Sequence, residues 1–462
     1  MKKAHLLLPF LVGLILYGCS PPPYDLAIRD VRIFDAHQNE VLLHKTILIK
    51  GDHIAAIVNA DELHRAVKSI EGKDRLLTSG FIDSHIHLTD MFGDYDRAPA
   101  YLLPDSLDVY ENRMKRTYLI HGTTTIADMG QPEKWLEVSL NWQKNPSPSR
   151  PNLFNTGGAI ISDEERTPYI SHTEVINAQA AIEKMATYES LGLTHIKLYW
   201  RLRKDDMKII VEEAKKRGLS IYGHIDQNVV SIQYAIDLGV KHFEHFLTLP
   251  ASVLNYQQHN QSLRRKYQLS FPRTTDEYLA MLMFYFDYIA NDPVLRSEFE
   301  ALIDKMAKSG CSLSTTIHPL GSIAGETYFF TSMAPPSQVE ALTLSYTSRQ
   351  KQQLRQAYVM MMKMLKYVHD KGVKVRIGTD CREGGKALLS ELLLLYEAGF
   401  SIGEILQIAT INGGDALKID DQYGTIEVGK KADLILFHQN PFNDYKHFLG
   451  EKTIIKGGQV VK

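Results

Sequence analysis

The segment GFIDSHIHL, residues 80–88, places two histidines one residue apart at the end of an apolar run. In a β-strand, side chains two positions apart point to the same face, so His85 and His87 can offer two imidazoles to one metal ion. The chain contains 18 histidines in 462 residues. At that frequency a His-x-His pair arises about once per chain by chance. Further candidate ligands elsewhere in the sequence are therefore needed to show whether this pair binds metal.

Length and composition indicate a folded protein of the size of an enzyme. The chain has 44% hydrophobic and 23% charged residues, which is typical of soluble globular proteins. Its length allows a barrel with an accessory domain. A formal net charge of -2 provides no basic field for nucleic acid or anionic lipid. We therefore expect a small-molecule substrate and no nucleic-acid partner, and an oligomer is compatible with these numbers.

The first 18 residues are interpreted as a lipoprotein signal peptide. Two lysines precede an apolar run, residues 6–17, that is too short to span a bilayer. The run ends in LYGCS, which resembles a bacterial lipobox with Cys19 as the acylated residue; the alternative is an ordinary secretory signal and a free thiol. Residues 19–23 then form a stiff, proline-rich tether. We expect an exported protein that contacts the membrane only through its lipid anchor, on the periplasmic face of the outer membrane if the host is Gram-negative.

Both ends of the chain are rich in β-branched residues, and the middle alternates between strand-like and helical segments. Residues 24–78 and 421–462 predict one small β-sandwich domain built from both ends. Between them, residues 79–420 contain helical stretches such as 178–192 and 207–218, each closing on a glycine. The expected strands end near His87, Asp128, Gly158, Tyr199, His224, His245, His318 and Asp380. Eight such units predict an α/β TIM barrel, whose chemistry lies at the carboxyl ends of its strands.

The sixth unit of this barrel is enlarged. His245 and His318 are 73 positions apart, whereas His224 and His245 are 21 apart. We therefore expect a helical insertion at about residues 250–310. Its apolar segment, DEYLAMLMFYFDYIAND (276–292), is interpreted as a helix facing the core rather than a lid or a dimer surface. The remaining cysteines, Cys311 and Cys381, should lie at opposite ends of neighbouring strands, too far apart for a disulfide.

The expected strand ends bring six polar side chains to one mouth of the barrel. They are His85, His87, Lys197, His224, His245 and Asp380. Their shared location indicates a site more strongly than any one residue does. His242 lies on the opposite strand face from His245, so it is not expected to line the mouth. His121 and His195 precede the ends of their strands and are interpreted as structural.

These segments resemble the amidohydrolase superfamily, and most closely its imidazolonepropionase-like and prolidase-like members. The motifs that carry the resemblance are GFIDSHIHL (80–88, after Ser79 where proline is usual), HGTTTIAD (121–128), HIKLY (195–199), GH (223–224), EH (244–245), GTD (378–380), ATINGGDAL (409–417) and GTIEVGKKADLILF (424–437). The resemblance covers nearly all of residues 24–462. It implies two divalent ions, one held by His85, His87 and Asp380 and the other by His224 and His245.

The same resemblance implies that Lys197 carries a CO₂-derived carbamate and bridges both ions. An unmodified, cationic lysine would repel the ions, whereas a carbamate supplies anionic oxygens. Zinc is expected because imidazole and carboxylate ligands suit it, although manganese, cobalt or iron would also fit. The implied nucleophile is a hydroxide shared by the ions. Asp380 is the implied catalytic residue, which accepts a proton from the water and delivers it to the leaving nitrogen.

Three further residues are candidates for substrate binding. Tyr199 and Arg201 follow Lys197 on the same strand face and could bind a substrate carboxylate, although Arg201 could instead pair with Asp205 or Asp206. His318 could contact a substrate carbonyl or be structural. Family dipeptidases often have a histidine after a glycine pair in the third unit, where this chain has Ala159.

The sequence therefore predicts a metal-dependent hydrolase of a C–N amide bond. The expected substrate is a small peptide or an N-acyl amino acid, such as an Xaa-Pro dipeptide. Hydrolysis of a cyclic amide, a lactone or an organophosphate is the enzymatic alternative. A binding lipoprotein without catalysis is the non-enzymatic alternative, but the retention of all six implied ligands argues against it.

Overall fold

A computed structural model describes residues 23–93, 99–163, 169–225, 229–326 and 346–461. The predicted signal peptide and Cys19 lie outside these residues. Within them, no helix combines the length and the apolar character needed to cross a bilayer.

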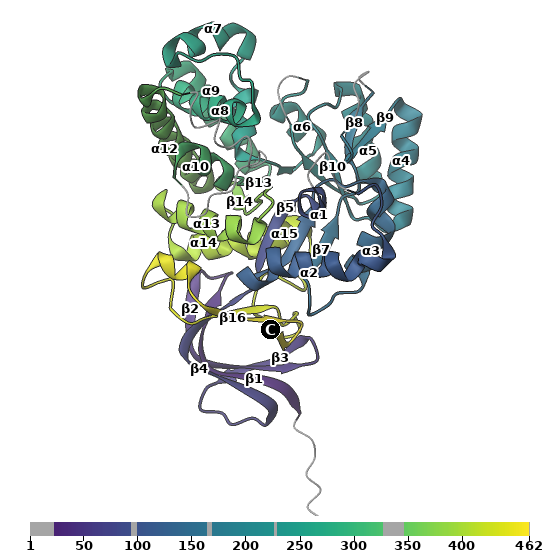
Figure 1. Ribbon diagram of the computed structural model, residues 1–462, viewed down its shortest axis with the longest axis vertical. Helices are drawn as coiled ribbons and strands as arrows, with labels where there is room; N and C mark the ends of the chain where they lie inside the picture. The colour runs from purple at the N-terminus through teal and green to yellow at the C-terminus, as the bar shows by residue number, and fades with distance from the viewer. Residues whose placement is uncertain (1–22, 94–98, 164–168, 226–228, 327–345, 462) are drawn as a thin grey trace, which may run out of the picture.

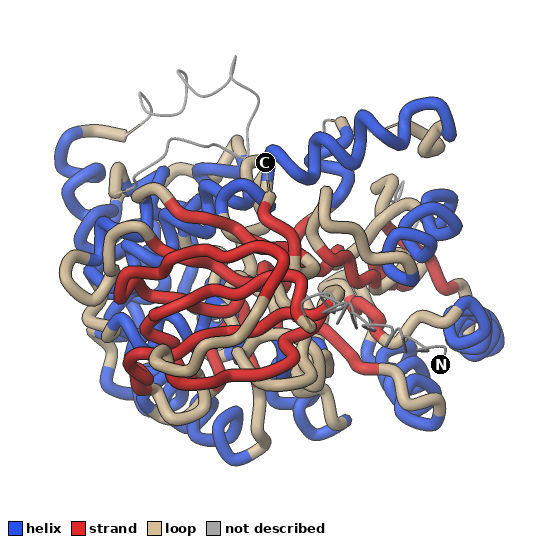
Figure 2. The backbone as a smooth tube through the Cα atoms, turned by 90° about the horizontal axis from the view of Figure 1, so that it is seen from below, coloured by secondary structure: helices blue, strands red, loops and turns tan. Residues whose placement is uncertain are grey.

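Strands from both ends of the chain form one mixed sheet at one end of the molecule (Figures 1 and 2). In spatial order they are β17 (Gln459–Val460), β16 (Lys452–Lys456), β15 (Leu434–Phe437), β4 (Ala66–Ser79), β1 (Tyr24–Asp35), β2 (Glu40–Lys50) and β3 (His53–Asn59). Strands β1 and β4 are parallel, and β15 joins β4 antiparallel. Buried aliphatic residues such as Ile28, Ile47 and Leu434 pack together on this sheet. Assembly from both chain ends is thus observed, whereas the two-layered sandwich stays a prediction.

Two parallel sheets carry the rest of the strands. One contains β5 (Phe81–Ile86), β6 (Thr123–Asp128) and β7 (Asn152–Asn155). The other has the order β14 (Lys374–Arg376), β13 (Ser312–Ser314), β12 (His242–Phe243), β11 (Ser220–Gly223), β10 (His195–Leu198), β8 (Ala159–Ser162) and β9 (His172–Val175). Parallel pairing within each sheet means that all these strands end on the same side.

Backbone hydrogen bonds join the two parallel sheets beside β5. The Ser84 amide donates to the Ile377 carbonyl at 2.9 Å, and the Asp380 amide donates to the His85 carbonyl at 2.9 Å. Only residues 156–158 separate β7 in one sheet from β8 in the other. The strand order and these contacts define a TIM-barrel-like α/β fold.

Helices follow most of the parallel strands and cover them (Figure 1). They are α1 (Leu88–Phe92), α2 (Leu107–Thr117), α3 (Leu136–Lys144), α4 (Ala178–Leu191), α5 (Lys204–Lys216), α6 (Ile232–Leu238), α13 (Gly384–Glu397), α14 (Ile402–Ala409) and α15 (Ile411–Leu417). Short 3₁₀ helices are η1 (Pro104–Ser106), η2 (Leu119–His121), η3 (Glu133–Trp135), η4 (Phe246–Ser252) and η5 (Tyr445–Leu449). The predicted glycine caps are confirmed, because Gly192 and Gly218 follow α4 and α5 with φ of 85° and 70°.

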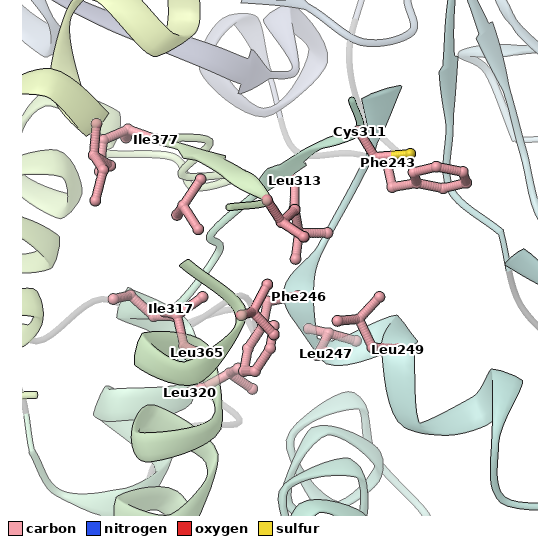
Figure 3. Packing of buried hydrophobic residues seen from close by; sticks show 14 of the residues in the cluster. Phe243, Phe246, Leu247, Leu249, Cys311, Leu313, Ile317, Leu320, Leu365 and Ile377 are labelled. Carbon is pink, nitrogen blue, oxygen red and sulfur yellow. The ribbon is translucent and has the colours of Figure 1, made fainter. Parts of the chain in front are cut away.

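Additional helices lie between β12 and β14, at the end of the molecule away from the mixed sheet (Figure 1). They are α7 (Tyr256–Tyr267), α8 (Thr275–Ala290), α9 (Pro293–Lys308), α10 (His318–Ala324) and α12 (Ser348–Asp370). Nine residues of α8 are buried, and Phe286 stacks on Phe246 with ring centroids 4.7 Å apart. Figure 3 shows the adjoining core, where Phe246 and Leu313 lie near Leu365 of α12. These contacts support the interpretation of 276–292 as a core-facing helix.

Two local predictions are wrong. The seventh strand ends at Ser314, and His318 is the first residue of α10 rather than the end of a strand. The left-handed φ of 53° at Thr316 turns the chain out of the sheet before that point. In addition, β8 and β9 are strands that the sequence pattern did not indicate. Cys311 and Cys381 are both buried, free thiols.

Candidate metal centre

The six predicted ligand residues all lie at the carboxyl ends of parallel strands. His85 belongs to β5 and His87 follows it directly; Lys197 belongs to β10. His224 and His245 follow β11 and β12, and Asp380 follows β14. Each strand needs only local β-propensity to form, but the parallel pairing places all six ends on one side.

The structure brings these side chains into one cluster. The ring centroid of His85 lies 5.2 Å from that of His87 and 4.4 Å from that of His245. The ring of His224 lies 4.6 Å from that of His245. Asp380 places Oδ1 3.6 Å from His87 Nε2 and Oδ2 3.9 Å from His245 Nδ1. One ligand atom each from His85, His245 and Asp380 lie within 4.8 Å of one another, which is close enough to share an ion.

Three of the histidines are held in the same tautomer. Their Nδ1 atoms each face a protein acceptor: the Glu244 carboxylate at 2.6 Å for His85, the Gly130 carbonyl at 3.0 Å for His87 and the Thr316 hydroxyl at 2.9 Å for His245. Since the Thr316 hydroxyl hydrogen is donated to the Gly378 carbonyl at 3.0 Å, its oxygen accepts from His245. Each ring therefore carries its proton on Nδ1 and presents Nε2 as the basic nitrogen, as ligating histidines do.

Burial keeps the imidazoles of His85, His224 and His245 neutral. It lowers the pKa of His85 to about 4, with a further contribution from Lys197. Burial also holds the pKa values of His224 and His245 well below the usual value. Neutral imidazole is the form that coordinates metal.

Lys197 is a buried lysine at the candidate centre. Its side chain is 1% exposed, and its Nζ has no hydrogen-bond partner among the described residues. Burial lowers the pKa of this amine to about 8, which increases the neutral form that can attack CO₂. His85 Nε2 is likewise buried without a hydrogen-bond partner in the described part of the chain. Two orphaned nitrogens beside Asp380 fit a centre that metal ions complete.

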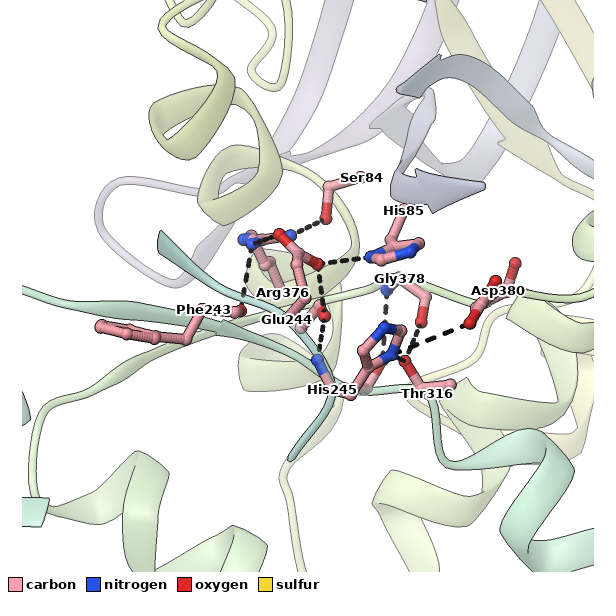
Figure 4. Close-up of polar contacts among 12 residues, drawn as sticks. Ser84, His85, Phe243, Glu244, His245, Thr316, Arg376, Gly378 and Asp380 are labelled. Carbon is pink, nitrogen blue, oxygen red and sulfur yellow. Dashed lines mark hydrogen bonds and ion pairs between the residues drawn. The ribbon is translucent and has the colours of Figure 1, made fainter. Parts of the chain in front are cut away.

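A buried ion pair between Glu244 and Arg376 lies next to His85, on the side of its Nδ1 atom (Figure 4). Glu244 Oε2 accepts from His85 Nδ1 and, at 2.7 Å, from the Ser314 hydroxyl. Its other oxygen, Oε1, lies 2.5 Å from Arg376 Nη2. Arg376 also donates to the Ser84 hydroxyl at 2.6 Å, and both charged side chains are fully buried. This network fixes the position and orientation of His85.

Left-handed backbone and a second carboxylate shape the loops that carry Asp380 and His245. Asp380 has φ of 46° and His245 has φ of 63°, left-handed conformations that are uncommon for residues other than glycine. Asp83 accepts from the Thr379 amide at 3.0 Å and from its hydroxyl at 2.6 Å. Burial raises the pKa of Asp83 to about 7. The strand that carries His85 therefore also braces the residue beside Asp380.

The candidate substrate residues have different surroundings. The ring of Tyr199 lies 5.0 Å from that of His224, so this residue borders the cluster. Arg201 is 3% exposed. Asp206, a suggested partner of Arg201, accepts from Arg203 at 2.9 Å. His318 is buried in α10, and its role in substrate binding stays a prediction.

Sequence reasoning missed the contributions of Glu244, Arg376 and Asp83. Glu244 was visible in the EH motif but was given no role. Arg376 could have been noticed as a charged residue inside the apolar strand segment VKVRIG. A buried charge of this kind requires a partner, although the sequence does not say which one.

Fold and site together define an α/β protein with a histidine-rich candidate metal site at its strand ends. The amidohydrolase family model matches residues 76–461, and the chain belongs to this family. This confirms the predicted superfamily.

Curated relatives include imidazolonepropionases. That of Bdellovibrio bacteriovorus is 23% identical over 311 residues, which cover 64% of this chain and 68% of the relative. That of Brevibacillus brevis is 35% identical over 99 residues, 20% of this chain and 23% of the relative. The chain thus matches about a quarter of the length of the latter protein.

Solved structures with the same fold include two peptidases. A prolidase in complex with N-methylphosphonate-L-proline has a TM-score of 0.67 at 16% identity, over 95% of this chain and 99% of that one. A Xaa-Pro dipeptidase with bound methionine has a TM-score of 0.64 at 17% identity, with the same coverage. These matches establish similarity of fold.

Proposed function

We propose that this protein is a metal-dependent hydrolase of C–N amide bonds that acts on small peptides or N-acyl amino acids, with Xaa-Pro dipeptides as the first candidates. One observation carries the proposal. Three histidines that present basic Nε2 atoms converge with Asp380 and with Lys197, whose Nζ has no hydrogen-bond partner among the described residues, in a chain of the amidohydrolase family.

The donor set suits two zinc ions. His85, His87 and Asp380 would hold one, His224 and His245 the other, and a carbamate on Lys197 would link them. When bound, such ions polarise a carbonyl oxygen and lower the pKa of a coordinated water. The carbamate is required because the buried lysine must contribute negative charge between two cations.

Asp380 is placed to move the proton of the reaction. Its carboxylate lies between His87 and His245, and its side chain is 15% exposed, so it reaches both the cluster and the solvent side. It accepts a proton from the attacking water and delivers it to the amide nitrogen as the C–N bond breaks. The products are a carboxylic acid and an amine. The hydrogen bond from the Asp380 backbone amide to the His85 carbonyl keeps the carboxylate in position during both proton transfers.

The substrate carboxylate is assigned to Tyr199 and Arg201. Tyr199 packs against His224, and the guanidinium of Arg201 is buried two residues further along the chain. A buried guanidinium is a strong carboxylate receptor. His318 is a third candidate, for a substrate carbonyl.

A cyclic amide is the second candidate substrate. It is favoured by the similarity to imidazolonepropionases, one of which aligns with 64% of this chain. The same catalytic groups could attack a lactone or an organophosphate. A substrate panel of Xaa-Pro dipeptides, N-acyl amino acids, lactams, lactones and phosphotriesters separates these reactions.

Chelation followed by repletion tests the central proposal. We expect activity on the panel to be lost with dipicolinate and restored by zinc with bicarbonate. Calcium, which prefers oxygen ligands, serves as the control ion and should not restore activity. A metal-free preparation with full activity would falsify the proposal, and inactivity of every metal-loaded form would favour a binding lipoprotein.

We also propose that the protein is exported and lipid-anchored through Cys19. The support is the charged start, short apolar run and LYGCS segment. Palmitate labelling of the full-length chain should depend on this cysteine, and a Cys19→Ala variant should leave the membrane fraction. A wild-type chain that stays unlabelled and soluble would contradict the anchor.

A further inference from the structure

A row of aromatic rings leads from the metal centre to the surface. Tyr199 packs against His224, with centroids 5.0 Å apart. His172 packs against Tyr199 at 4.6 Å, and Tyr169 against His172 at 5.0 Å. Tyr199 and His172 are half-buried, whereas Tyr169 is 48% exposed. The row therefore becomes more accessible with distance from His224.

The additional strand β9 places His172 beside the site. It pairs in parallel with β8 (Figure 1), and His172 lies directly opposite Ala159 in the register. Paired residues of neighbouring strands point to the same face, so His172 shares the face of Ala159. Ala159 lies near Gly130, whose carbonyl binds His87.

The small size of Ala159 matters for this arrangement. In the register of the parallel strands, Ala159 lies opposite Lys197 of β10 on one side and opposite His172 of β9 on the other, and it places only a methyl group between them. The imidazole at this side of the site comes from β9, 13 positions further along the chain.

We propose that Tyr169, His172 and the ring of Tyr199, here called the aromatic wall, bind an aromatic group of the substrate, while the Tyr199 hydroxyl remains the group assigned to the substrate carboxylate. This inference rests on the proposed function, because it assigns to the wall the substrate portion that extends from the bond cleaved at the centre. Contact between aromatic rings adds a specific attraction to the burial of their surface. We expect it to strengthen binding by about tenfold.

Two simple phosphonates test the wall without requiring hydrolysis. Both methylphosphonate and benzylphosphonate present the same anion to the zinc-loaded, full-length protein, and only the second has a ring. Calorimetry should give a Kd about tenfold lower for benzylphosphonate. His172→Ala should remove most of this difference, whereas His172→Phe, which keeps a ring, should retain it. Zinc content per chain, measured on each variant, shows that the centre is intact.

Two further variants sharpen the comparison. Tyr169→Ala changes an exposed ring and should reduce the preference without disturbing the core. His259→Ala is the matched control, because His259 of α7 also packs edge-on against a tyrosine, Tyr288, at 5.8 Å but lies in the additional helices. The control should leave the preference unchanged.

The outcomes separate this inference from the proposed function. Three results would contradict binding of an aromatic group by the aromatic wall. They are equal affinity of the wild type for both phosphonates, absence of binding, and a full preference for benzylphosphonate in His172→Ala. A tenfold preference for benzylphosphonate without hydrolysis of any amide would support the aromatic wall as a binding surface and contradict the proposed hydrolase function. If both hold, kcat/KM for Phe-Pro should exceed that for Gly-Pro, and His172→Ala should reduce this ratio through KM.

Discussion

Replacing Arg376 with methionine should destabilise the protein strongly, because Arg376 compensates a buried charge. Arg376 makes four hydrogen bonds, to the side chains of Ser84, Ser312 and Glu244 and to the Phe243 carbonyl. Both members of the ion pair with Glu244 are 0% exposed. Methionine keeps the length of the arginine side chain up to Nε but lacks the guanidinium end, so a small cavity adds to the main effect, which is an uncompensated carboxylate.

The expected cost is about 3–5 kcal/mol, the range for breaking one side of a buried ion pair. Glu244→Gln alone should cost a similar amount, since it leaves Arg376 unpaired. The double variant should be far less destabilised than the sum of the two, because glutamine can still bond His85 and Ser314. The coupling energy in this double-mutant cycle should exceed about 2 kcal/mol.

Urea unfolding of the metal-free protein measures these differences, since bound metal would add its own stabilisation. Arg296→Met is the control, because Arg296 and Glu300 form an exposed pair with side chains 64% and 41% accessible. That change should cost less than about 1 kcal/mol. If Arg376→Met costs no more than the control, or if the two buried substitutions are additive, the argument for a charge-compensating pair behind His85 is refuted.

Three more predictions concern the centre and the pH response. Asp380→Asn should lower kcat at least about 100-fold in steady-state assays, because the amide cannot accept the proton; a change below threefold would exclude the proton-transfer role. Lys197→Met should retain the fold by circular dichroism but bind fewer than two zinc ions per chain by elemental analysis, and full occupancy would rule out a bridging carbamate. Burial lowers the pKa of His121 to about 4 from 6.5, so the unfolded state binds more protons between these values and stability should fall as the pH drops through this window. In urea titrations, His121→Gln should reduce the slope of the free energy of unfolding against pH between these pKa values. An unchanged slope would show that other groups cause the pH dependence.

The sequence by itself determined most of the order of strands and helices and the polar residues near the strand ends. These features depend on residues close together in the chain: alternation in a strand, a glycine after a helix, or two histidines one position apart. For that reason the segments ending near His87, Asp128 and His224 could be located without a structure, and the family motifs followed from them.

Only the tertiary structure decided which groups support the centre. Glu244 and Arg376 are 132 positions apart, and His172 faces Ala159 only because β9 pairs beside β8. The position of His318 could not be derived because the chain leaves the sheet at Thr316, through a left-handed conformation that its residue type disfavours. Such features depend on distant contacts that compensate a buried charge or a strained backbone, and no local pattern records those contacts.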